Sequence, residues 1–359
     1  MLYGVILAGG KGERFWPLSL AERPKQFLRL ISDKTMIEET IDRVLPLIPF
    51  ENIRIVTGRS MSKLSRENVK GLDERHILAE PFGRNTCAAV GLAAVHLVHD
   101  DEDAVLVTLS ADHLVKPPEK LLRILNSAAA IASAEDCLIT IGIVPTRPET
   151  AYGYIKLGDI YKHEQDFIFY RVSAFTEKPK AAVAHEYYYS HDYLWNSGMF
   201  VWSAKSILAA IKKCQPDLGE LLVEYATHIG TPGENAARES LYEKATSISV
   251  DFAVLEKATN VLTVKADIIW DDIGGWNSLS RHRDSDNDNN VVVGDALVLD
   301  SYETVVYNEG DGIITCLGVS DLIVVRSANI TLVVHKTKAD RVKEILARLE
   351  ENENTRQYL

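Results

Sequence analysis

Closely spaced glycines and two cations near the start of the chain are residue types that bind phosphate. They follow a short apolar run, Leu2 to Leu7, and the small residue Ala8, and are, in order, Gly9, Gly10, Gly12, Arg14 and Lys25. Glycine lacks a Cβ atom, so backbone N–H groups beside it can approach phosphate oxygens closely. Arginine and lysine then supply the positive charge that a polyphosphate requires. This order of residues predicts a phosphate-binding loop at the end of a strand.

Two common glycine motifs do not fit this segment. The sequence lacks the Gly, four residues and Gly-Lys-Ser/Thr of a Walker loop. A dinucleotide-binding motif would need a glycine where Phe15 stands, and Pro17 would interrupt the helix that such a motif opens. An ordinary glycine turn after an edge strand is the remaining alternative, and the spacing of Arg14, Pro17 and the pair Pro24-Lys25 disfavours it.

The composition is that of an ordinary globular protein and argues against several classes. The 359 residues are 46% hydrophobic and 25% charged, and the formal net charge of −12 argues against nucleic acid as a partner. The sequence has no apolar run long enough for a membrane-spanning helix, so we expect no membrane partner. It also lacks a secretory signal pattern, and its four cysteines lack zinc or redox spacing. We therefore expect a cytoplasmic protein with free thiols.

The order of the predicted elements indicates an α/β fold. Strands are predicted at residues 3–7, 52–57, 104–109 and 137–144. Helical patterns lie between them at residues 35–47, 85–99 and 121–134. Such alternation predicts parallel βαβ units, whose ligands bind beyond the carboxyl ends of the strands. The part that follows, about 152–276, is more mixed. Extended segments are predicted at 154–157, 168–175, 199–202 and 261–269, and helices at 205–214 and 249–258.

The last part of the sequence has a different pattern. Residues 281–290 are rich in Asn and Asp and are typical of a linker. Short Val- and Ile-rich runs alternate with turns over 291–336, which predicts a small β-rich unit of hairpins or short solenoid coils. Residues 338–349 carry apolar side chains at helical spacing and predict a closing amphipathic helix.

Carboxylates stand at two positions that suit a metal ion. Asp112 follows a predicted strand, two residues after Ser110, and Asp271 and Asp272 precede a glycine turn. Mg²⁺ prefers oxygen ligands and is usually held by one or two carboxylates together with water and phosphate. We therefore expect Asp112 to be a metal ligand, whereas His113 beside it has a structural role. Asp271 is expected to be exposed or to cap a helix.

The opening motif resembles that of the sugar-1-phosphate nucleotidyltransferases. The shared pattern is Gly-Gly-x-Gly-x-Arg, then Pro-Leu, then Pro-Lys, and the strings 15–19 and 24–26 are similar to those of mannose-1-phosphate guanylyltransferases. The resemblance runs from residue 1 to about residue 280. It implies a Rossmann-like nucleotidyltransferase domain with a mixed, mostly parallel sheet over residues 1–280. A nucleotide half would span about 1–150 and a sugar half about 151–280, before the linker 281–290 and the β-rich unit 291–359.

The resemblance also implies a reaction, in which GTP and mannose 1-phosphate give GDP-mannose and pyrophosphate. The sugar phosphate is already an anionic nucleophile, so the displacement at the α-phosphorus needs alignment and charge neutralisation but no protein base. Mg²⁺ is the implied cofactor, with Asp112 and Asp272 as its ligands. One alternative is a pyrophosphorylase for another sugar phosphate or nucleotide. A second is a catalytically silent subunit that binds nucleotide sugars, which the presence of all the expected charged residues disfavours.

Further site residues are implied by the same resemblance. Those assigned to the nucleotide are Leu7, Ala8, Gly9, Gly10, Gly12, Glu80, Pro81, Gly83, Arg84, Asn85, Thr86 and Ser110. Those assigned to the sugar are Gly153, Glu177 and Asn196, and the catalytic cations are Arg14, Lys25 and Lys178. The string 80–86 is the strongest pointer to guanylyl transfer, although Cys87-Ala88 stands where the family usually has Ala-Pro. Arg84 is expected to be exposed while lining the nucleotide site.

Some members of this family carry a fused C-terminal phosphomannose isomerase barrel. The sequence given ends at Leu359, which leaves too little after the β-rich segment for such a barrel, so we expect a single activity. The β-rich unit could pack on the main domain or on a second subunit, and a homodimer is therefore one predicted assembly.

Overall fold

The computed structural model describes residues 1–10 and 12–359, and Lys11 lies outside the described residues. The described chain divides into two compact units, each made of segments that are far apart in sequence. Unit 1 consists of Met1–Gly9, Thr40–Ala111 and Val115–Trp270. Unit 2 consists of Gly10–Glu39, Asp112–Leu114 and Asp271–Leu359. The domains expected from the sequence are continuous ranges of residues, whereas these units are not. The expected domain boundaries therefore stay a prediction.

Unit 1 is built around a nine-stranded sheet with the order β3-β2-β1-β4-β9-β6-β10-β8-β7 among the described residues. The strands are β1 Leu2–Leu7, β2 Ile53–Gly58, β3 Ile77–Glu80, β4 Val105–Ser110, β6 Leu138–Ile143, β7 Gly153–Glu164, β8 Phe167–Thr176, β9 Tyr193–Ser203 and β10 Val261–Ala266. The first four strands in this order run parallel, and β9 lies antiparallel between β4 and β6. The predicted mixed sheet is confirmed.

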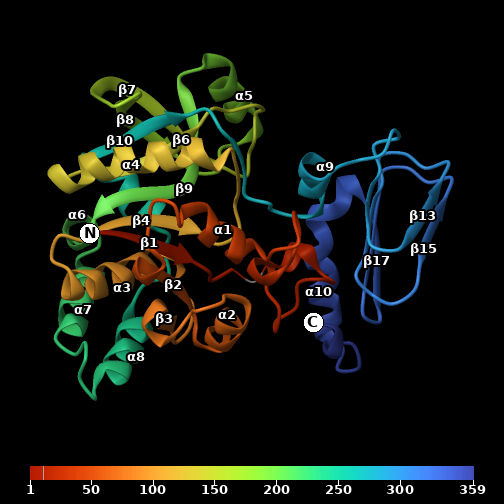
Figure 1. The fold of residues 1–359 in the computed structure, drawn as a ribbon, viewed down its shortest axis with the longest axis horizontal. Coiled ribbons are helices and arrows are strands. Elements are labelled where there is room, and N and C mark those ends of the chain that lie inside the picture. The colour runs from red at the N-terminus through yellow and green to blue at the C-terminus, as the bar shows by residue number, and fades with distance from the viewer. Residues whose placement is uncertain (11) are drawn as a thin grey trace. The chain divides into compact units, whose positions relative to one another are not determined.

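Helices cover this sheet, so its central strands are mostly apolar and buried along most of their length. All six residues of β6 are buried, as parallel strands covered on both faces require. The helices wholly within unit 1 are α2 Ser62–Asn68, α3 Asn85–Asp100, α4 Pro118–Ala134, α5 Ala181–Ser190, α6 Ala204–Cys214, α7 Pro216–Ala226 and α8 Glu234–Lys244. The predicted helix over 35–47 is α1 Met36–Val44, which has residues in both units. Helix α4 packs on β4 and β9, whereas α3, α6 and α7 pack on one another (Figure 1). A Cβ on Gly91 would lie 2.7 Å from Leu222, so this glycine allows α3 and α7 to approach closely.

Some elements of unit 1 differ from the sequence-based expectation. The predicted strand at 154–157 is the start of a twelve-residue strand, β7, paired with the long strand β8. The predicted helix over 249–258 is a π-helix at Asp251–Leu255. Helices α2, α5, α7 and α8 were not predicted. A π-helix widens the turn by one residue and is common at functional sites, and periodicity alone does not reveal it.

The parallel strands of unit 1 bring several sequence-predicted residues to one edge of the sheet. Strands β1, β3 and β4 end at Leu7, Glu80 and Ser110, and parallel strands end at the same edge. The Oε2 atom of Glu80 lies 3.7 Å from the point where a Cβ would stand on Gly9. The start of the glycine loop and the end of β3 are therefore neighbours, as the βαβ pattern predicts.

Unit 2 contains a short β-helix that ends in a hairpin. Its strands are β12 Val291–Val293, β13 Ala296–Leu299, β14 Val305–Asn308, β15 Ile314–Leu317, β16 Leu322–Ser327 and β17 Ile330–His335. Strands β12, β14 and β16 run parallel, as do β13 and β15, and β17 pairs antiparallel with β16. Val291 pairs with Val305, 14 residues later, and Val305 pairs with Ile323, 18 residues later. The coils have unequal length, so no single repeat period shows in the sequence.

The segment after the glycine loop is built into the core of unit 2. Trp276 is 1% exposed, and its ring packs 5.2 Å from Phe15 and 5.7 Å from Tyr307, between ring centroids. Its Nε1–H donates to the carbonyl of Trp16 at 3.1 Å. The Nε1–H of Trp16 donates to the carbonyl of Tyr358 at 2.8 Å. The β-helix core and the end of the chain thus hold the backbone that follows the glycines.

The closing helix begins later than predicted. A 3₁₀ segment at Lys336–Arg341 precedes helix α10 at Val342–Glu351, and the short helix α9 at Leu279–His282 stands before the β-helix.

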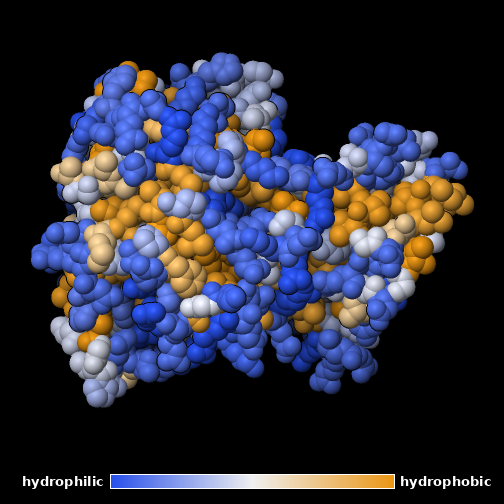
Figure 2. Space-filling model, in the orientation of Figure 1, coloured by the Kyte–Doolittle hydropathy of each residue, from blue (hydrophilic) through white to orange (hydrophobic). Residues whose placement is uncertain are grey.

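Exposed apolar side chains gather on β13 and β15, where Leu297, Leu299 and Leu317 are about half exposed or more (Figure 2). Among the described residues, no helix is both long enough and apolar enough to cross a membrane.

Candidate active site

A cavity of about 320 Å³ lies in unit 2 beside the glycine loop. Its lining combines loop backbone with cations and carboxylates, and consists of Gly12, Glu13, Arg14, Phe15, Lys25, Asp112, His113, Asp272, Gly274 and Lys343. The structure therefore gathers Gly12, both N-terminal cations and both expected metal ligands around one hollow. Glu13, Phe15, Gly274 and Lys343 are lining residues that the sequence analysis did not single out.

The ammonium group of Lys25 joins two distant segments of the chain. Its side chain is 8% exposed, and Nζ donates to Asp112 Oδ2 at 2.7 Å and to the carbonyl of Asp272 at 2.6 Å. Gly12 has a φ of 66°, and a Cβ at this position would lie 2.2 Å from the Cβ of Lys25. Only glycine tolerates both this positive φ and the close approach of Lys25. Gly12 therefore allows Lys25 to take its position, and it also leaves the loop backbone open to a ligand.

The two expected metal ligands each have a cation nearby. Burial raises the pKa of Asp112, but the adjacent Lys25 ammonium and His113 lower it more, so the net pKa is below the usual value. Arg14 Nη1 donates to the carbonyl of Gly274 at 3.2 Å. A Cβ on Gly274 would stand 3.0 Å from Asp272 Oδ2 and 3.4 Å from Arg14 Nη1, so the carboxylate and guanidinium lie on the same side of this glycine.

These residues fit the donor set of Mg²⁺. Two aspartates line the same cavity, and hard divalent cations prefer carboxylate oxygen. The chain offers no larger cluster of His, Cys, Asp or Glu able to hold a metal within residues 1–10 and 12–359. The arrangement matches the usual way of holding Mg²⁺, in which phosphate and water complete the coordination of one or two carboxylates.

The expectation that Asp271 is exposed or caps a helix is wrong. Its side chain is 2% exposed and pairs with Arg281 at 2.7 Å and with His282 at 2.9 Å. Burial raises the pKa of Asp271, but His282 and Arg281 together lower it to about 2. The backbone N–H of Ile273 also donates to Asp271 at 2.8 Å. Asp271 is thus a buried anchor for the turn that carries Asp272.

In unit 1, the segment after β3 is held by α8 and the loop that follows it. Arg84 is partly buried rather than exposed, and donates to the carbonyls of Tyr242 at 2.6 Å and Glu243 at 3.3 Å. The Thr86 hydroxyl accepts from the N–H of Val250 at 2.9 Å. Arg84 and Thr86 therefore fix the loop in place. The expected exposure of Arg84 is wrong, because the C-terminal carbonyls of α8 attract a cation.

The other residues assigned to this loop have varied surroundings. Glu80 is 5% exposed, and burial raises the pKa of its carboxyl to about 7. Asn85 has a φ of 66°, and its side chain accepts from the N–H of Thr86 at 2.8 Å. Pro81 is partly buried, and Gly83 is exposed with open space around it. Of these residues, Glu80 is the one with a buried titratable group.

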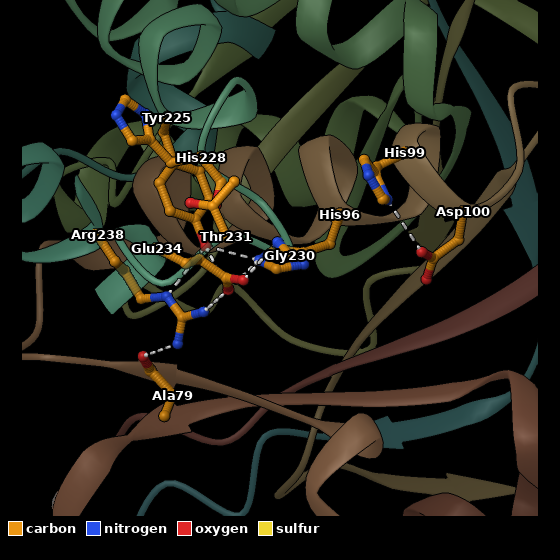
Figure 3. Close-up of polar contacts among 10 residues, drawn as sticks. All are labelled: Ala79, His96, His99, Asp100, Tyr225, His228, Gly230, Thr231, Glu234 and Arg238. Carbon is orange, nitrogen blue, oxygen red and sulfur yellow. Dashed lines mark hydrogen bonds and ion pairs between the residues drawn. The ribbon is translucent and has the colours of Figure 1, made fainter. Parts of the chain in front are cut away.

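A partly buried polar network contacts the end of β3 (Figure 3). The Tyr225 hydroxyl lies 2.8 Å from His96 Nε2 and accepts from Arg238 Nε at 3.1 Å. Arg238 also pairs with Glu234 and donates to the carbonyl of Ala79 at 3.4 Å. Burial lowers the pKa of His96 to about 4, with help from the nearby Arg238 charge. The network links α3, α7 and α8 to the residue before Glu80, and no local sequence motif indicates it.

The sugar-assigned residues of unit 1 lie together on β7, on β9 and directly after β8. A Cβ on Gly153 would stand 2.3 Å from Glu177 Oε2 and 3.4 Å from the Cβ of Asn196. Lys178 Nζ lies 2.5 Å from Glu177 Oε1, and Lys178 has a φ of 48°, a strained value for lysine. Glycine at 153 thus leaves room for the Glu177 carboxylate.

Sequence reasoning missed one acidic neighbour of this group, Asp251. Asn196 Nδ2 donates to Asp251 Oδ1 at 2.7 Å, and Asn196 Oδ1 accepts from the Thr140 hydroxyl at 2.9 Å. Burial and the nearby Glu177 raise the pKa of Asp251 to about 6. The only available signal was the location of Asp251 at the start of the predicted helix over 249–258, which does not indicate a site.

Some nucleotide-assigned residues contribute backbone that the sheet already uses. Ala8 donates its N–H to the Val56 carbonyl at 2.8 Å, and its own carbonyl accepts from the Thr57 hydroxyl at 2.9 Å. The carbonyl of Leu7 accepts from the N–H of Ala111 at 3.0 Å. Ser110 is partly buried at the end of β4. These residues hold the start of the loop to its neighbouring strands.

Replacement of Gly12 by alanine tests its conformational role. Gly12→Ala is expected to lower the free energy of unfolding by about 2 kcal/mol or more, because Ala disfavours this φ and its Cβ would overlap Lys25. Gly10→Ala is the matched control, since a Cβ there meets nothing within 4 Å, and its effect should stay within about 0.5 kcal/mol. Urea unfolding followed by tryptophan fluorescence measures both. Equal stability of the two variants would contradict the assignment.

The buried Glu80 predicts a pH-dependent stability. Its pKa is raised from 4.5 to about 7, so the folded state binds the proton more tightly and stability falls as pH rises through this window. Glu80→Gln removes the effect, and its stability relative to the native protein should rise by about 2–3 kcal/mol between pH 5 and pH 8. Urea unfolding at both values measures this change. The exposed Glu186→Gln is the control, and a pH-independent difference for Glu80→Gln would argue against a buried, neutral Glu80.

Comparison with known proteins supports this interpretation of the fold. Residues 3–289 match the nucleotidyl transferase family, and residues 294–349 match the MannoseP isomerase/GMP-like beta-helix domain. Mannose-1-phosphate guanylyltransferase of Escherichia coli K12 is 35% identical over 97% of this chain and 73% of its own length. Alginate biosynthesis protein AlgA of Pseudomonas putida is 33% identical over 99% of this chain and 73% of its own length.

A solved structure agrees with this match. The crystal structure named mannose-1-phosphate geranyltransferase, from Thermus thermophilus, superposes with a TM-score of 0.87 and 36% identity. The superposition covers 97% of this chain and 99% of that chain. The chain thus belongs to the nucleotidyl transferase family and, within it, to the group of mannose-1-phosphate guanylyltransferases.

Proposed function

We propose that this chain joins GTP and mannose 1-phosphate to form GDP-mannose and pyrophosphate. The observation that carries the proposal is the cavity of unit 2, where Arg14 and Lys25 lie beside Asp112 and Asp272. Cations and metal-binding acids around one hollow suit phosphoryl transfer, in which positioning and charge neutralisation supply most of the catalysis. The names of relatives about 35% identical over almost the whole chain support the choice of substrates.

The proposed reaction is an in-line displacement. An oxygen of the sugar phosphate forms a bond to the α-phosphorus of GTP, and the bond from that phosphorus to the bridging oxygen breaks, which releases pyrophosphate. No proton has to leave the nucleophile. Lys25 and Arg14 would bind phosphate oxygens as negative charge shifts towards the leaving pyrophosphate. The contacts of Lys25 with Asp112 and the Asp272 carbonyl hold its ammonium group in place before the substrate binds.

Magnesium is the proposed cofactor, with Asp112 and Asp272 as its protein ligands. The chemistry that Mg²⁺ supplies when bound is neutralisation and alignment of phosphate oxygens. The lowered pKa of Asp112 keeps its carboxylate ionised and ready to bind a cation at neutral pH. The contacts of the buried Asp271 carboxylate with Arg281 and His282 hold the backbone that presents Asp272.

The residues of unit 1 are assigned to the base and the sugar. The loop 80–86, braced through Arg84 and Thr86, would bind the guanine nucleotide. Glu177 and Asn196 would accept from and donate to sugar hydroxyls, and Lys178 would bind the sugar phosphate. The bonds from Asn196 to Asp251 and from Thr140 to Asn196 support this role, because they hold the amide in one orientation. A cytoplasmic location and a homodimer stay predictions.

A substrate matrix tests the proposed function. Pyrophosphate release is measured with Mg²⁺ for four nucleoside triphosphates against mannose, glucose and N-acetylglucosamine 1-phosphates. Release is expected chiefly with GTP and mannose 1-phosphate. Release with another pair would keep the mechanism but overturn the role given to residues 80–86. No release from a folded protein that binds nucleotide sugars would favour a regulatory subunit.

Replacement of one metal-binding acid tests the mechanism. Asp112→Asn is expected to lower kcat by about 100-fold or more, because it removes one charge from the proposed metal site and from the partner of Lys25. Asp284→Asn, an exposed carboxylate outside the cavity lining, is the control and should keep full activity. Circular dichroism establishes that both variants fold. Activity of Asp112→Asn within threefold of the native protein would remove Asp112 from the site.

A further inference from the structure

Helix α10 begins beside the glycine loop. It contacts the 3₁₀ turn at Glu13–Phe15, and its first residue, Val342, is 1% exposed in the same apolar core as Phe15. The next residue, Lys343, lines the cavity that also contains Arg14 and Lys25. A residue near the end of the chain therefore shares a hollow with the phosphate-binding loop. All of these residues belong to unit 2.

The charge on Lys343 is held only loosely. Its ammonium lies 3.4 Å from Glu13 Oε2, beyond the usual range of a strong N–H···O bond, and the two side chains are 56% and 39% exposed. Exposed ion pairs of this kind contribute little free energy. A lysine side chain can therefore leave such a partner for a more highly charged anion at small cost.

The other two cations of the cavity, Lys25 and Arg14, are held by closer hydrogen bonds than Lys343. Lys25 is nearly buried and engaged by Asp112 and by the carbonyl of Asp272, and Arg14 donates to the carbonyl of Gly274. Among the described lining residues, three cations thus stand with three carboxylates, those of Glu13, Asp112 and Asp272. A triphosphate carries more negative charge than Glu13, so it would draw Lys343 away from that carboxylate.

We propose that Lys343 binds the terminal phosphates of the nucleoside triphosphate and then the pyrophosphate product. This inference rests on the proposed function. Lys343 exchanges Glu13 for phosphate oxygens when the triphosphate enters, and it returns to Glu13 when pyrophosphate leaves. The β-helix unit thereby gains a direct role, since its closing helix delivers a third cation to the cavity. Glu13 acts as the resting partner of that cation.

Kinetics of Lys343→Met test the proposal, because methionine keeps the apolar stem and removes the charge. We expect the KM for GTP to rise five- to tenfold, and the KM for pyrophosphate in the reverse reaction to rise similarly. The KM for mannose 1-phosphate should stay within twofold, which separates phosphate binding from a general structural effect. Lys343→Arg should restore most of the loss. Arg348→Ala, an exposed cation of α10 outside the cavity, should match the native protein.

Calorimetric titration with Mg²⁺-pyrophosphate gives a readout that does not depend on the substrates assigned. Lys343→Met should bind pyrophosphate five- to tenfold more weakly than the native protein. Unchanged KM values and unchanged pyrophosphate affinity would overturn the role of Lys343 while leaving the proposed function intact. If the native protein transfers no nucleotide to mannose 1-phosphate, the proposed function fails, and the pyrophosphate titration still decides the role of Lys343. Should Lys343→Met fail to fold, Lys343→Gln with the same titration provides the decision.

Discussion

The cavity depends on the position of one buried cation, Lys25. Its ammonium bonds to Asp112, which follows β4, and to the backbone of Asp272, which lies 160 residues further along the chain. That position requires Gly12, because any Cβ there would overlap the Lys25 side chain. The glycine is therefore a packing requirement as much as a means of exposing backbone N–H groups. Three segments that supply the proposed chemistry meet because one lysine bonds to two of them and packs on the third.

Buried aromatic packing keeps these segments from separating. Trp276 follows the turn of Asp272 and is enclosed by Phe15 from the loop and Tyr307 from the β-helix. The buried Asp271 carboxylate contacts Arg281 and His282 next to it, so the turn is held on both sides. The β-helix is thus part of the support of the cavity. The proposed phosphate contact of Lys343 extends this support into the chemistry itself.

Much of unit 1 and several site residues could be predicted from the sequence. Strands β1 and β4 and helix α3 could be predicted because each shows a local pattern of apolar residues in the sequence. The full length of the β7–β8 hairpin, helix α8 and the π-helix were missed. Partners far along the chain contact α8 and the π-helix, as the bonds of Arg84 to the Tyr242 carbonyl and of Asn196 to Asp251 show. The predicted exposure of Arg84 and Asp271 was wrong because long-range contacts bury both side chains. Their partners, the end of α8 and the pair Arg281 and His282, are not local in sequence.

The sequence by itself determined the family, the candidate phosphate-binding loop and the candidate acids, because these are strings of residues with a fixed local spacing. It also determined that the last part is β-rich, since Val and Ile runs alternate there with turns. Only the tertiary structure decided that those runs form parallel coils of unequal length. It also placed Lys343 in the cavity and Asp251 beside Asn196. These outcomes depend on which distant segments pack together, and packing between distant segments leaves no periodic trace in the chain.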